Sequence, residues 1–213
     1  MPKKPTTPFG HIAFAKDGRI RREISQLSDD KATQETEAAT RFVHKFNEAF
    51  PSRQITELTQ LPENDHDFSA FVAGSRVHLQ LTELVDRTYT FAMSEQEYRA
   101  GKWACAVHDK SGGIPRRIDE EVRDQALGNV IKAKLAKQYA KPSGSSLWLV
   151  VFTTVQYLTE YMSEGRLQVS NGLQLARQSL SMTSAHPFAE IWFTDLQTRP
   201  VSVWPHHAAG SAT

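Results

Sequence analysis

Asp67 and Gln80 are the two residues of this chain whose types and spacing could bind a metal ion. Asp67 leads a short β-rich stretch at 68–72, and an Ala-Gly-Ser turn signal follows that stretch. The next stretch, 77–84, alternates apolar and polar residues, so Gln80 belongs to a polar row on one face of a strand. An acid at the head of one strand therefore faces a polar row on the next strand, thirteen residues along the chain. This geometry can hold a divalent metal ion, and an ordinary half-exposed hairpin is the alternative.

Two predicted helices would position further side chains around this hairpin. The first runs from an N-cap at Ser28 to about residue 50, and Glu37 lies near the N-terminal end of its apolar stripe. The second covers about 117–140, and Lys134 lies on the ridge opposite its most polar face. Lys134 is therefore expected on a buried face, where it either serves the site or extends its ammonium group to solvent.

The remaining patterned stretches predict a mixed central sheet. Residues 54–61 are typical of a strand, and the continuous apolar run 147–153 predicts a strand that is buried on both faces, as in a βαβ crossover. Shorter patterns predict further strands at 188–193 and 201–204, and helices at 157–163 and 172–182. Residues 86–115 have the weakest secondary-structure pattern in the chain. The fold class expected from these patterns is a single α/β domain with its sheet flanked by helices.

The composition and charge limit the classes of protein to which the chain can belong. With 213 residues and 39% hydrophobic content, the chain is long enough for one domain with a core. The net charge of +1 gives no global attraction to nucleic acid, so any basic surface must be local. Cys105 is the single cysteine, which excludes an internal disulfide and a thiolate metal cage and indicates a reducing, cytoplasmic compartment. No apolar run approaches the ~20 residues of a membrane helix, and no signal peptide is expected.

The chain is predicted to divide into three parts. Residues 1–27 form an N-terminal arm, 28–205 form the α/β domain, and 206–213 form a polar tail. No internal repeat and no linker longer than a loop interrupts the central part.

A short β-ribbon is expected within the N-terminal arm. Residues 12–15 and 20–24 could pair across an Asp-Gly turn, which is a strong hairpin signal. Arg19, Arg21 and Arg22 lie in the second strand of this ribbon or directly before it. These cations could contact phosphates, and a solvated ribbon is the alternative.

The order of these elements resembles that of a known nuclease superfamily. The predicted order is helix, strand, strand, strand, helix, strand, with Asp67 leading one strand and Gln80-Leu81-Thr82 on the next. This combination resembles the PD-(D/E)xK nuclease superfamily, which has the restriction-endonuclease-like fold. The lysine-rich helix end at 131–139 and the apolar strand 147–152 directly after it also carry the resemblance, which covers roughly 28–193.

The resemblance implies a magnesium-dependent nuclease that acts on DNA. In that family the acid heading the second core strand and the acid of the (D/E)xK pair bind Mg²⁺, and the lysine helps to activate the attacking water. Asp67 falls at the first acid position, Gln80 at the second, and Thr82 at the lysine position. Gln80 offers an amide oxygen without negative charge, and Thr82 cannot replace the charge of a lysine. Lys134 could supply that charge from its helix, and Glu37 could add a carboxylate from the first helix.

We therefore expect a site formed by Asp67, Gln80, Lys134 and Glu37, with Mg²⁺ bound by Asp67 and Gln80. DNA is the expected partner, and a homodimer is compatible with this function. One alternative is a catalytically inactive member of the same fold that binds nucleic acid or another protein. Another alternative is an unrelated α/β enzyme whose site lies in 86–115. In the nuclease, Asp67 and Gln80 should lie within a few ångströms of each other, with Lys134 or Glu37 converging on them.

Overall fold

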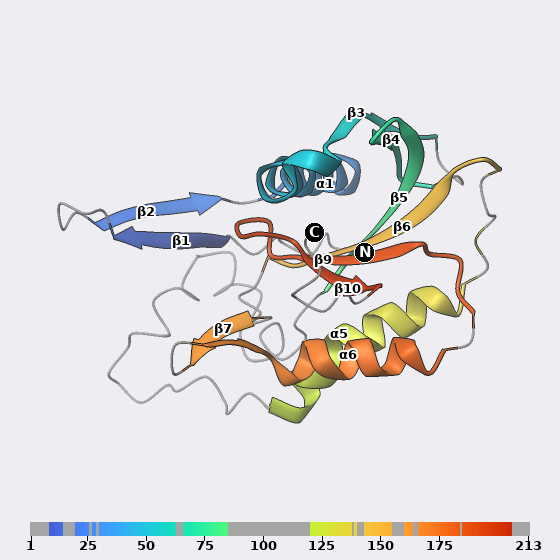
Figure 1. Ribbon diagram of the computed structural model, residues 1–213. Helices are drawn as coiled ribbons and strands as arrows, with labels where there is room; N and C mark the ends of the chain where they lie inside the picture. The colour runs from blue at the N-terminus through green and yellow to red at the C-terminus, as the bar shows by residue number, and fades with distance from the viewer. Residues whose placement is uncertain are drawn as a thin grey trace.

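The chain folds as an α/β protein in which helices flank a mixed sheet, as the computed structural model in Figure 1 shows. The structure describes residues 9–14, 20–25, 27–28, 30–62, 66–84, 120–137, 139, 143–154, 160–163, 166–183 and 185–205. The interpretations given above for 86–115 and for the tail at 206–213 concern residues outside this described part.

The central sheet has six strands in the spatial order β10-β9-β6-β5-β4-β3. Their bounds are Ile55–Gln60 (β3), Phe68–Val72 (β4), Ser75–Glu83 (β5), Ser146–Phe152 (β6), Glu190–Thr194 (β9) and Val201–Trp204 (β10). β5, β6 and β9 are parallel, whereas β3, β4 and β10 join the sheet through antiparallel pairing. The apolar run predicted as a central strand is β6, and six of its seven residues are buried. The mixed α/β sheet expected from the sequence is thus confirmed.

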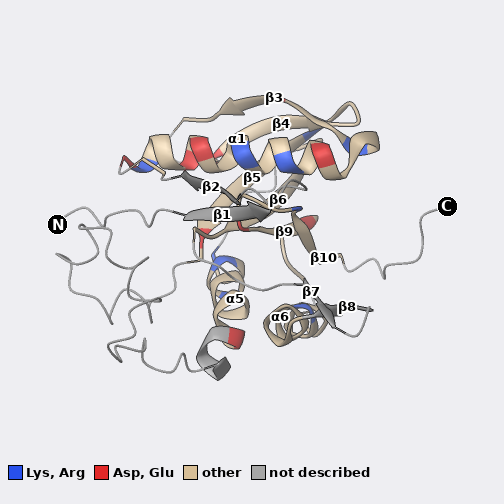
Figure 2. Cartoon of the chain, turned by 90° about the vertical axis from the view of Figure 1, so that its left-hand side faces the viewer, with Lys and Arg blue, Asp and Glu red and all other residues tan. Residues whose placement is uncertain are grey.

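Helices cover both faces of this sheet (Figures 1 and 2). Helix α1, Lys31–Ala49, lies on one face, and α5, Glu120–Leu135, lies with α6, Asn171–Ser181, on the other. Phe46 of α1 belongs to the core layer on the first face, and Ile131 of α5 belongs to the core layer on the second. Helices α1 and α5 bury the faces that the sequence predicted to be buried, and this burial fixes which of their polar residues can face the sheet.

A two-residue turn sets the register between β4 and β5. Ala73 has φ 47° and Gly74 has φ 80°. Positive φ at both central residues is the geometry of a type I′ hairpin turn, which glycine adopts without steric penalty. The turn places Phe68 opposite Leu79 in the antiparallel ladder.

Two further pairs of strands lie outside the central sheet. β1, Phe9–Phe14, pairs antiparallel with β2, Ile20–Ser25. β7, Glu160–Ser163, pairs antiparallel with β8, Arg166–Val169. The helix predicted at 157–163 was therefore wrong over its described residues. A glutamate and a glycine separate β7 from β8 in the sequence, and a two-residue connection that contains glycine is compatible with a tight hairpin turn.

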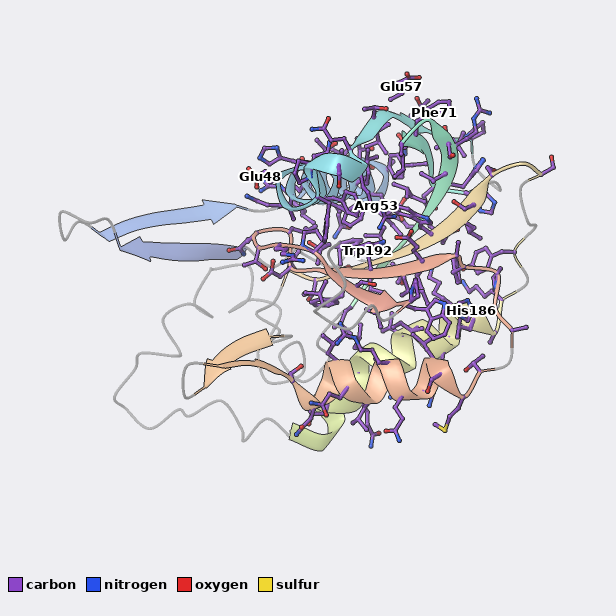
Figure 3. The ribbon with its side chains drawn as sticks, in the orientation of Figure 1. Glu48, Arg53, Glu57, Phe71, His186 and Trp192 are labelled. Carbon is purple, nitrogen blue, oxygen red and sulfur yellow. The ribbon has the colours of Figure 1, made fainter. Side chains whose placement is uncertain are left out.

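An aromatic and charged cluster joins the C-terminal end of α1 to the sheet. Arg53 Nη2 donates to Glu190 Oε1 at 2.6 Å, and Trp192 Nε1 donates to Glu190 Oε2 at 2.8 Å. The Arg53 guanidinium carbon also lies 5.9 Å from the ring centroid of Phe46 and 5.6 Å from that of Trp148. Arg53 and Trp192 can be followed in Figure 3. These contacts fix the orientation of α1 on the sheet.

Asp30, not Ser28, is the N-cap of α1. Asp30 Oδ2 accepts a hydrogen bond from the Thr33 backbone N–H at 3.0 Å, as an N-cap side chain does for the third helical residue. Ser28 Oγ instead accepts from the Asp30 backbone N–H at 3.1 Å, outside the helix. The sequence offered several capping residue types in succession, and residue type alone did not distinguish among them.

Loss of this cap should destabilise the protein. Asp30→Ala is expected to lower the free energy of unfolding by about 0.5–2 kcal/mol, because the Thr33 backbone N–H loses its acceptor. Urea denaturation measures the change. Asp30→Asn is the matched control, since asparagine caps about as well as aspartate. Equal losses for the two variants would contradict the capping role.

Candidate functional site

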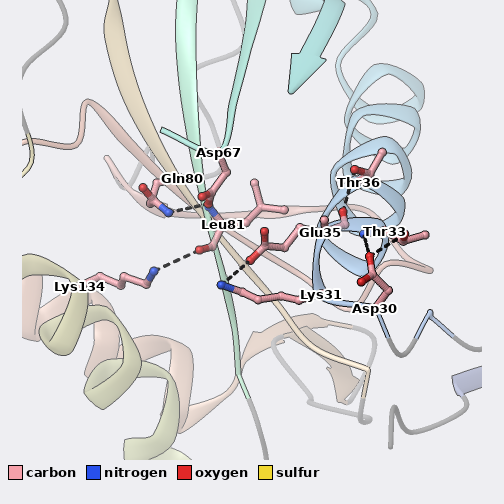
Figure 4. Close-up of polar contacts among 10 residues, drawn as sticks. Asp30, Lys31, Thr33, Glu35, Thr36, Asp67, Gln80, Leu81 and Lys134 are labelled. Carbon is pink, nitrogen blue, oxygen red and sulfur yellow. Dashed lines mark hydrogen bonds and ion pairs between the residues drawn. The ribbon is translucent and has the colours of Figure 1, made fainter. Parts of the chain in front are cut away.

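The pairing of β4 with β5 places Asp67 beside Gln80. Because Phe68 stands opposite Leu79, the residue directly before β4 lies across from Gln80. Gln80 Nε2 donates to Asp67 Oδ2 at 2.5 Å, and the Leu81 backbone N–H donates to the same oxygen at 2.6 Å (Figure 4). The amide of Gln80 is buried, with 8% of the residue exposed. The acid and the polar row expected across the hairpin are thus in direct contact.

Lys134 reaches the same strand from α5. Its Nζ donates to the Leu81 carbonyl oxygen at 3.2 Å. Ile131, three residues earlier on the same ridge, is buried in the core, so this side of α5 faces the sheet. The backbone of Leu81 therefore donates its N–H to Asp67 and accepts at its C=O from Lys134.

A second carboxylate comes from the first part of α1. Glu35 is partly buried, and its Oε1 lies 3.5 Å from Lys31 Nζ. The charge of Asp67 contributes to a raised pKa of Glu35, so the two carboxylates lie within electrostatic range of each other. Figure 4 shows Glu35 and Lys31 extending from α1 toward Leu81 on β5 and the neighbouring Asp67.

The expected helix acid, Glu37, is not brought to this cluster. Its Oε2 instead accepts from the Ser28 backbone N–H at 3.0 Å. Residues two apart on a helix point about 200° apart, so Glu35 and Glu37 cannot both face the sheet. The sequence did contain a signal for Glu35: it precedes the buried Ala38 and Ala39 by three and four residues, and therefore extends their stripe by one turn.

Thr82, which was expected to take the place of a catalytic lysine, lies on β5 and is partly buried. It follows Gln80 by two residues and so shares its face of the strand. A hydroxyl group there brings no positive charge. The positive charge near β5 comes from Lys134 on α5 instead.

Burial dominates the ionisation of the cluster. It raises the pKa of Asp67, against the opposing effects of the Leu81 hydrogen bond and the charges of Lys134 and Lys31. Burial is also the largest cause of the raised pKa of Glu35, followed by the charge of Asp67. The pKa of Lys134 is lowered first by burial and then by the charge of Lys137. All three groups are thus held in surroundings that disfavour their charged forms, which is common at functional sites.

The raised pKa of Asp67 makes the stability of the protein depend on pH. The folded state holds this proton more tightly than the unfolded state. The resulting stabilisation is fully present below the unfolded pKa, near 3.8, and is lost as the pH rises through the folded pKa. Asp67→Asn should therefore gain stability relative to wild type as the pH rises from about 3.8 through the folded pKa of Asp67.

Urea denaturation at a series of pH values measures this difference. Glu48→Gln is the control of opposite sign, because a hydrogen bond from Lys45 lowers the pKa of Glu48. That variant should lose stability relative to wild type as the pH rises. A pH-independent difference between wild type and Asp67→Asn would contradict the raised pKa.

Two histidines and a tyrosine line the neighbourhood of Asp67. The ring centroids of His66 and His78 lie 5.1 Å apart in an edge-on arrangement, and the Tyr139 centroid lies 6.5 Å from that of His66. The charge of Asp67 contributes to a raised pKa of Tyr139, after burial. Tyr139 also packs on Phe188, with centroids 5.2 Å apart. The sequence placed Tyr139 within a helix predicted to about residue 140, whereas α5 ends at Leu135, so the position of Tyr139 beside His66 was not predicted.

No family model matches this chain, and neither a curated protein nor a solved structure matches it significantly. Among the described helices, none is long and apolar enough to cross a membrane.

The donor atoms of the cluster are oxygens of the kind that Mg²⁺ prefers. Two carboxylates, Asp67 and Glu35, lie near the amide of Gln80 and the carbonyl of Leu81. Rotation of the Gln80 amide by 180° exchanges its nitrogen and its oxygen, so the same side chain can donate to Asp67 or offer an oxygen. Within the residues that the structure describes, no group of three or more His, Cys, Asp or Glu side chains could hold a metal ion. Any metal site here would thus depend on the amide, a backbone carbonyl and water in addition to the acids.

Proposed function

We propose that this chain is a divergent PD-(D/E)xK-type nuclease that hydrolyses DNA with Mg²⁺. The order α1, β3, β4, β5, α5, β6 supports this proposal, because it is the order of elements in the superfamily that the sequence resembles. The observation that carries the proposal is the convergence of Asp67 and Lys134 on the backbone of Leu81, with Gln80 bonded to Asp67. Asp67 and Gln80 lie across a hairpin, Lys134 comes from a helix more than fifty residues further along the chain, and the Leu81 backbone bonds to both charged residues.

The chemistry of phosphodiester hydrolysis explains why these groups would be needed together. Asp67 and the Gln80 amide oxygen would hold Mg²⁺, and Glu35 would add the second carboxylate that Gln80 lacks. When bound, the ion supplies charge neutralisation and a polarised water. Lys134 supplies a cation beside β5 where Thr82 provides none. Its lowered pKa brings it nearer to the range in which a lysine can exchange a proton with water.

The proposal extends to the partner and the location of the protein. DNA is the proposed substrate, a homodimer is a compatible assembly, and the single Cys105 fits the cytoplasm. The expected phosphate contacts of the N-terminal ribbon concern Arg19 and the side chains of Arg21 and Arg22, which lie outside the described structure. They remain part of the proposal on the strength of the sequence alone.

A plasmid-cleavage assay tests the proposed activity. Supercoiled DNA is incubated with wild type in Mg²⁺, in Mn²⁺ and in EDTA, and the same series is run with Asp67→Ala. Metal-dependent nicking by wild type that Asp67→Ala loses is the expected result. Absence of cleavage under every condition would contradict the nuclease, and cleavage that Asp67→Ala leaves unchanged would rule out this site.

One observation favours a second candidate, a noncatalytic nucleic-acid-binding or protein-interaction module of the same fold. Asp67 Oδ2 already accepts two hydrogen bonds, and Lys134 already donates to a backbone carbonyl, so the cluster satisfies its own polar groups. Such a cluster can stabilise a fold without chemistry. Retained DNA binding without cleavage, measured by fluorescence anisotropy with a labelled duplex, would favour the nucleic-acid-binding form of this candidate.

A further inference from the structure

Lys31, the first residue of α1, contributes a second ammonium group to the cluster around Leu81. Its Nζ lies 3.5 Å from Glu35 Oε1, and the side chain is 84% exposed. Figure 4 shows Lys31 approaching from α1, whereas Lys134 approaches from α5. The two lysines therefore reach this end of β5 from opposite helical layers.

The positive charge of Lys31 acts on all three other charged groups of the cluster. It opposes the rise in the pKa of Asp67 and of Glu35, and it adds to the lowering of the pKa of Lys134. Two ammonium groups and two carboxylates give a formal sum of zero charge, since two positive charges balance two negative ones. A divalent metal ion added to this set would leave an excess of positive charge, which favours an anionic substrate.

The ammonium groups of Lys31 and Lys134 differ in how accessible they are to a ligand. Lys134 is partly buried, and one of its three donors is directed to the Leu81 carbonyl oxygen. Lys31 is largely in solvent, and it forms an ion pair with Glu35 on the same helix, whose side chain is 25% exposed. An ion pair between residues four apart on a helix contributes little free energy when one partner is exposed, so a stronger anion can replace Glu35 as the partner of Lys31 at small loss.

We propose that the Lys31 ammonium group binds the phosphate of the DNA backbone at the candidate site, opposite Lys134. This inference rests on the proposed function and deepens it, because it assigns a substrate-binding residue that the sequence comparison did not supply. Lys31 and Lys134 would hold one phosphate from two sides, while the pair of Lys31 with Glu35 keeps the ammonium group close to the site in the free protein.

The test compares three variants with wild type. Lys31→Ala removes the charge, Lys31→Arg keeps it, and Lys45→Ala removes a matched charge from the same helix. Lys45 is the appropriate control because it also pairs within α1, with Glu48 Oε2 at 2.8 Å, and lies fourteen residues along the helix from Lys31, about 21 Å away. Thermal unfolding followed by circular dichroism checks that every variant is folded.

The first readout is metal-free binding of a fluorescein-labelled duplex in EDTA over a series of salt concentrations. Lys31→Ala should reduce the slope of log affinity against log salt by about one, as expected for one lost phosphate contact. Lys31→Arg and Lys45→Ala should keep the wild-type slope. The second readout is the single-turnover cleavage rate with Mg²⁺ at saturating DNA, which Lys31→Ala should lower by about 10²-fold.

The outcomes separate this inference from the proposed function. A wild-type salt slope in Lys31→Ala, an equal loss in Lys45→Ala, or no binding of DNA by wild type would each overturn the role of Lys31. Cleavage by wild type and its loss in Asp67→Ala would sustain the nuclease even then. Conversely, a slope reduced in Lys31→Ala alone would sustain the phosphate contact even if wild type did not cleave.

Discussion

Asp67→Ala is expected to lower the rate of magnesium-dependent DNA cleavage by about 10³-fold or more. A bound metal ion provides several kcal/mol of charge stabilisation in the transition state, and about 4 kcal/mol corresponds to a factor of 10³. Asp67 is the acid that heads β4 and the one in direct contact with Gln80 and the Leu81 peptide. Its removal would leave Glu35 as the one carboxylate of the set described here. Single-turnover cleavage of a labelled duplex measures the rate.

Two controls separate loss of the charge from loss of the fold. Asp67→Asn keeps the shape of the side chain and should be as inactive as Asp67→Ala, because the amide lacks the charge. Glu48→Ala removes a carboxylate that lies on α1 far from the cluster and is exposed, and it should cleave like wild type. An active Asp67→Asn variant would show that the negative charge is not required.

The largest expected loss of stability follows from Phe46→Ala, at about 3–5 kcal/mol. Phe46 is 0% exposed, and its ring centroid lies 4.8 Å from that of Phe50 and 5.0 Å from that of Trp192. A third contact, with Trp148 at 5.8 Å, connects α1 to β6. Truncation would leave a cavity between α1 and the sheet that these rigid rings cannot fill.

Urea denaturation measures the change in the free energy of unfolding of Phe46→Ala. Leu175→Ala is the control, because Leu175 on α6 is 45% exposed and its truncation should change stability by less than about 0.5 kcal/mol. A loss below about 1.5 kcal/mol for Phe46→Ala would show that the surrounding aromatic side chains collapse into the space.

The sequence predicted the elements whose signals are local and strong. The apolar run of β6 and the turn at Ala73 and Gly74 depend on composition and on backbone preference, and both are present as expected. The contact of Asp67 with Gln80 also followed from local information, because a tight turn fixes which residues of a hairpin stand opposite each other. Lys134 could be placed on the buried side of its helix from periodicity alone.

The features whose positions were not predicted from the sequence are those that depend on tertiary packing. Which acid of α1 meets Asp67 is decided by the rotation of that helix on the sheet, and the rings of Phe42 and Phe46 set this rotation. The apolar stripe indicated the rotation, but following it by one further turn was needed to reach Glu35 instead of Glu37. The positions of Lys31 and Tyr139 depend on where α1 begins and where α5 ends, and the sequence predicted both of these bounds only approximately.

One of the two edge strands of the central sheet, β3, limits how copies of this chain can associate. β3 ends the strand order, and Glu57, with φ 54°, interrupts its ladder with β4 between Thr56 and Thr59. An irregular, polar border of this kind resists the addition of a foreign strand, which is how sheet proteins avoid aggregation and amyloid growth. A homodimer of this chain should therefore assemble through a different surface, and the border at β3 should favour solubility at high concentration.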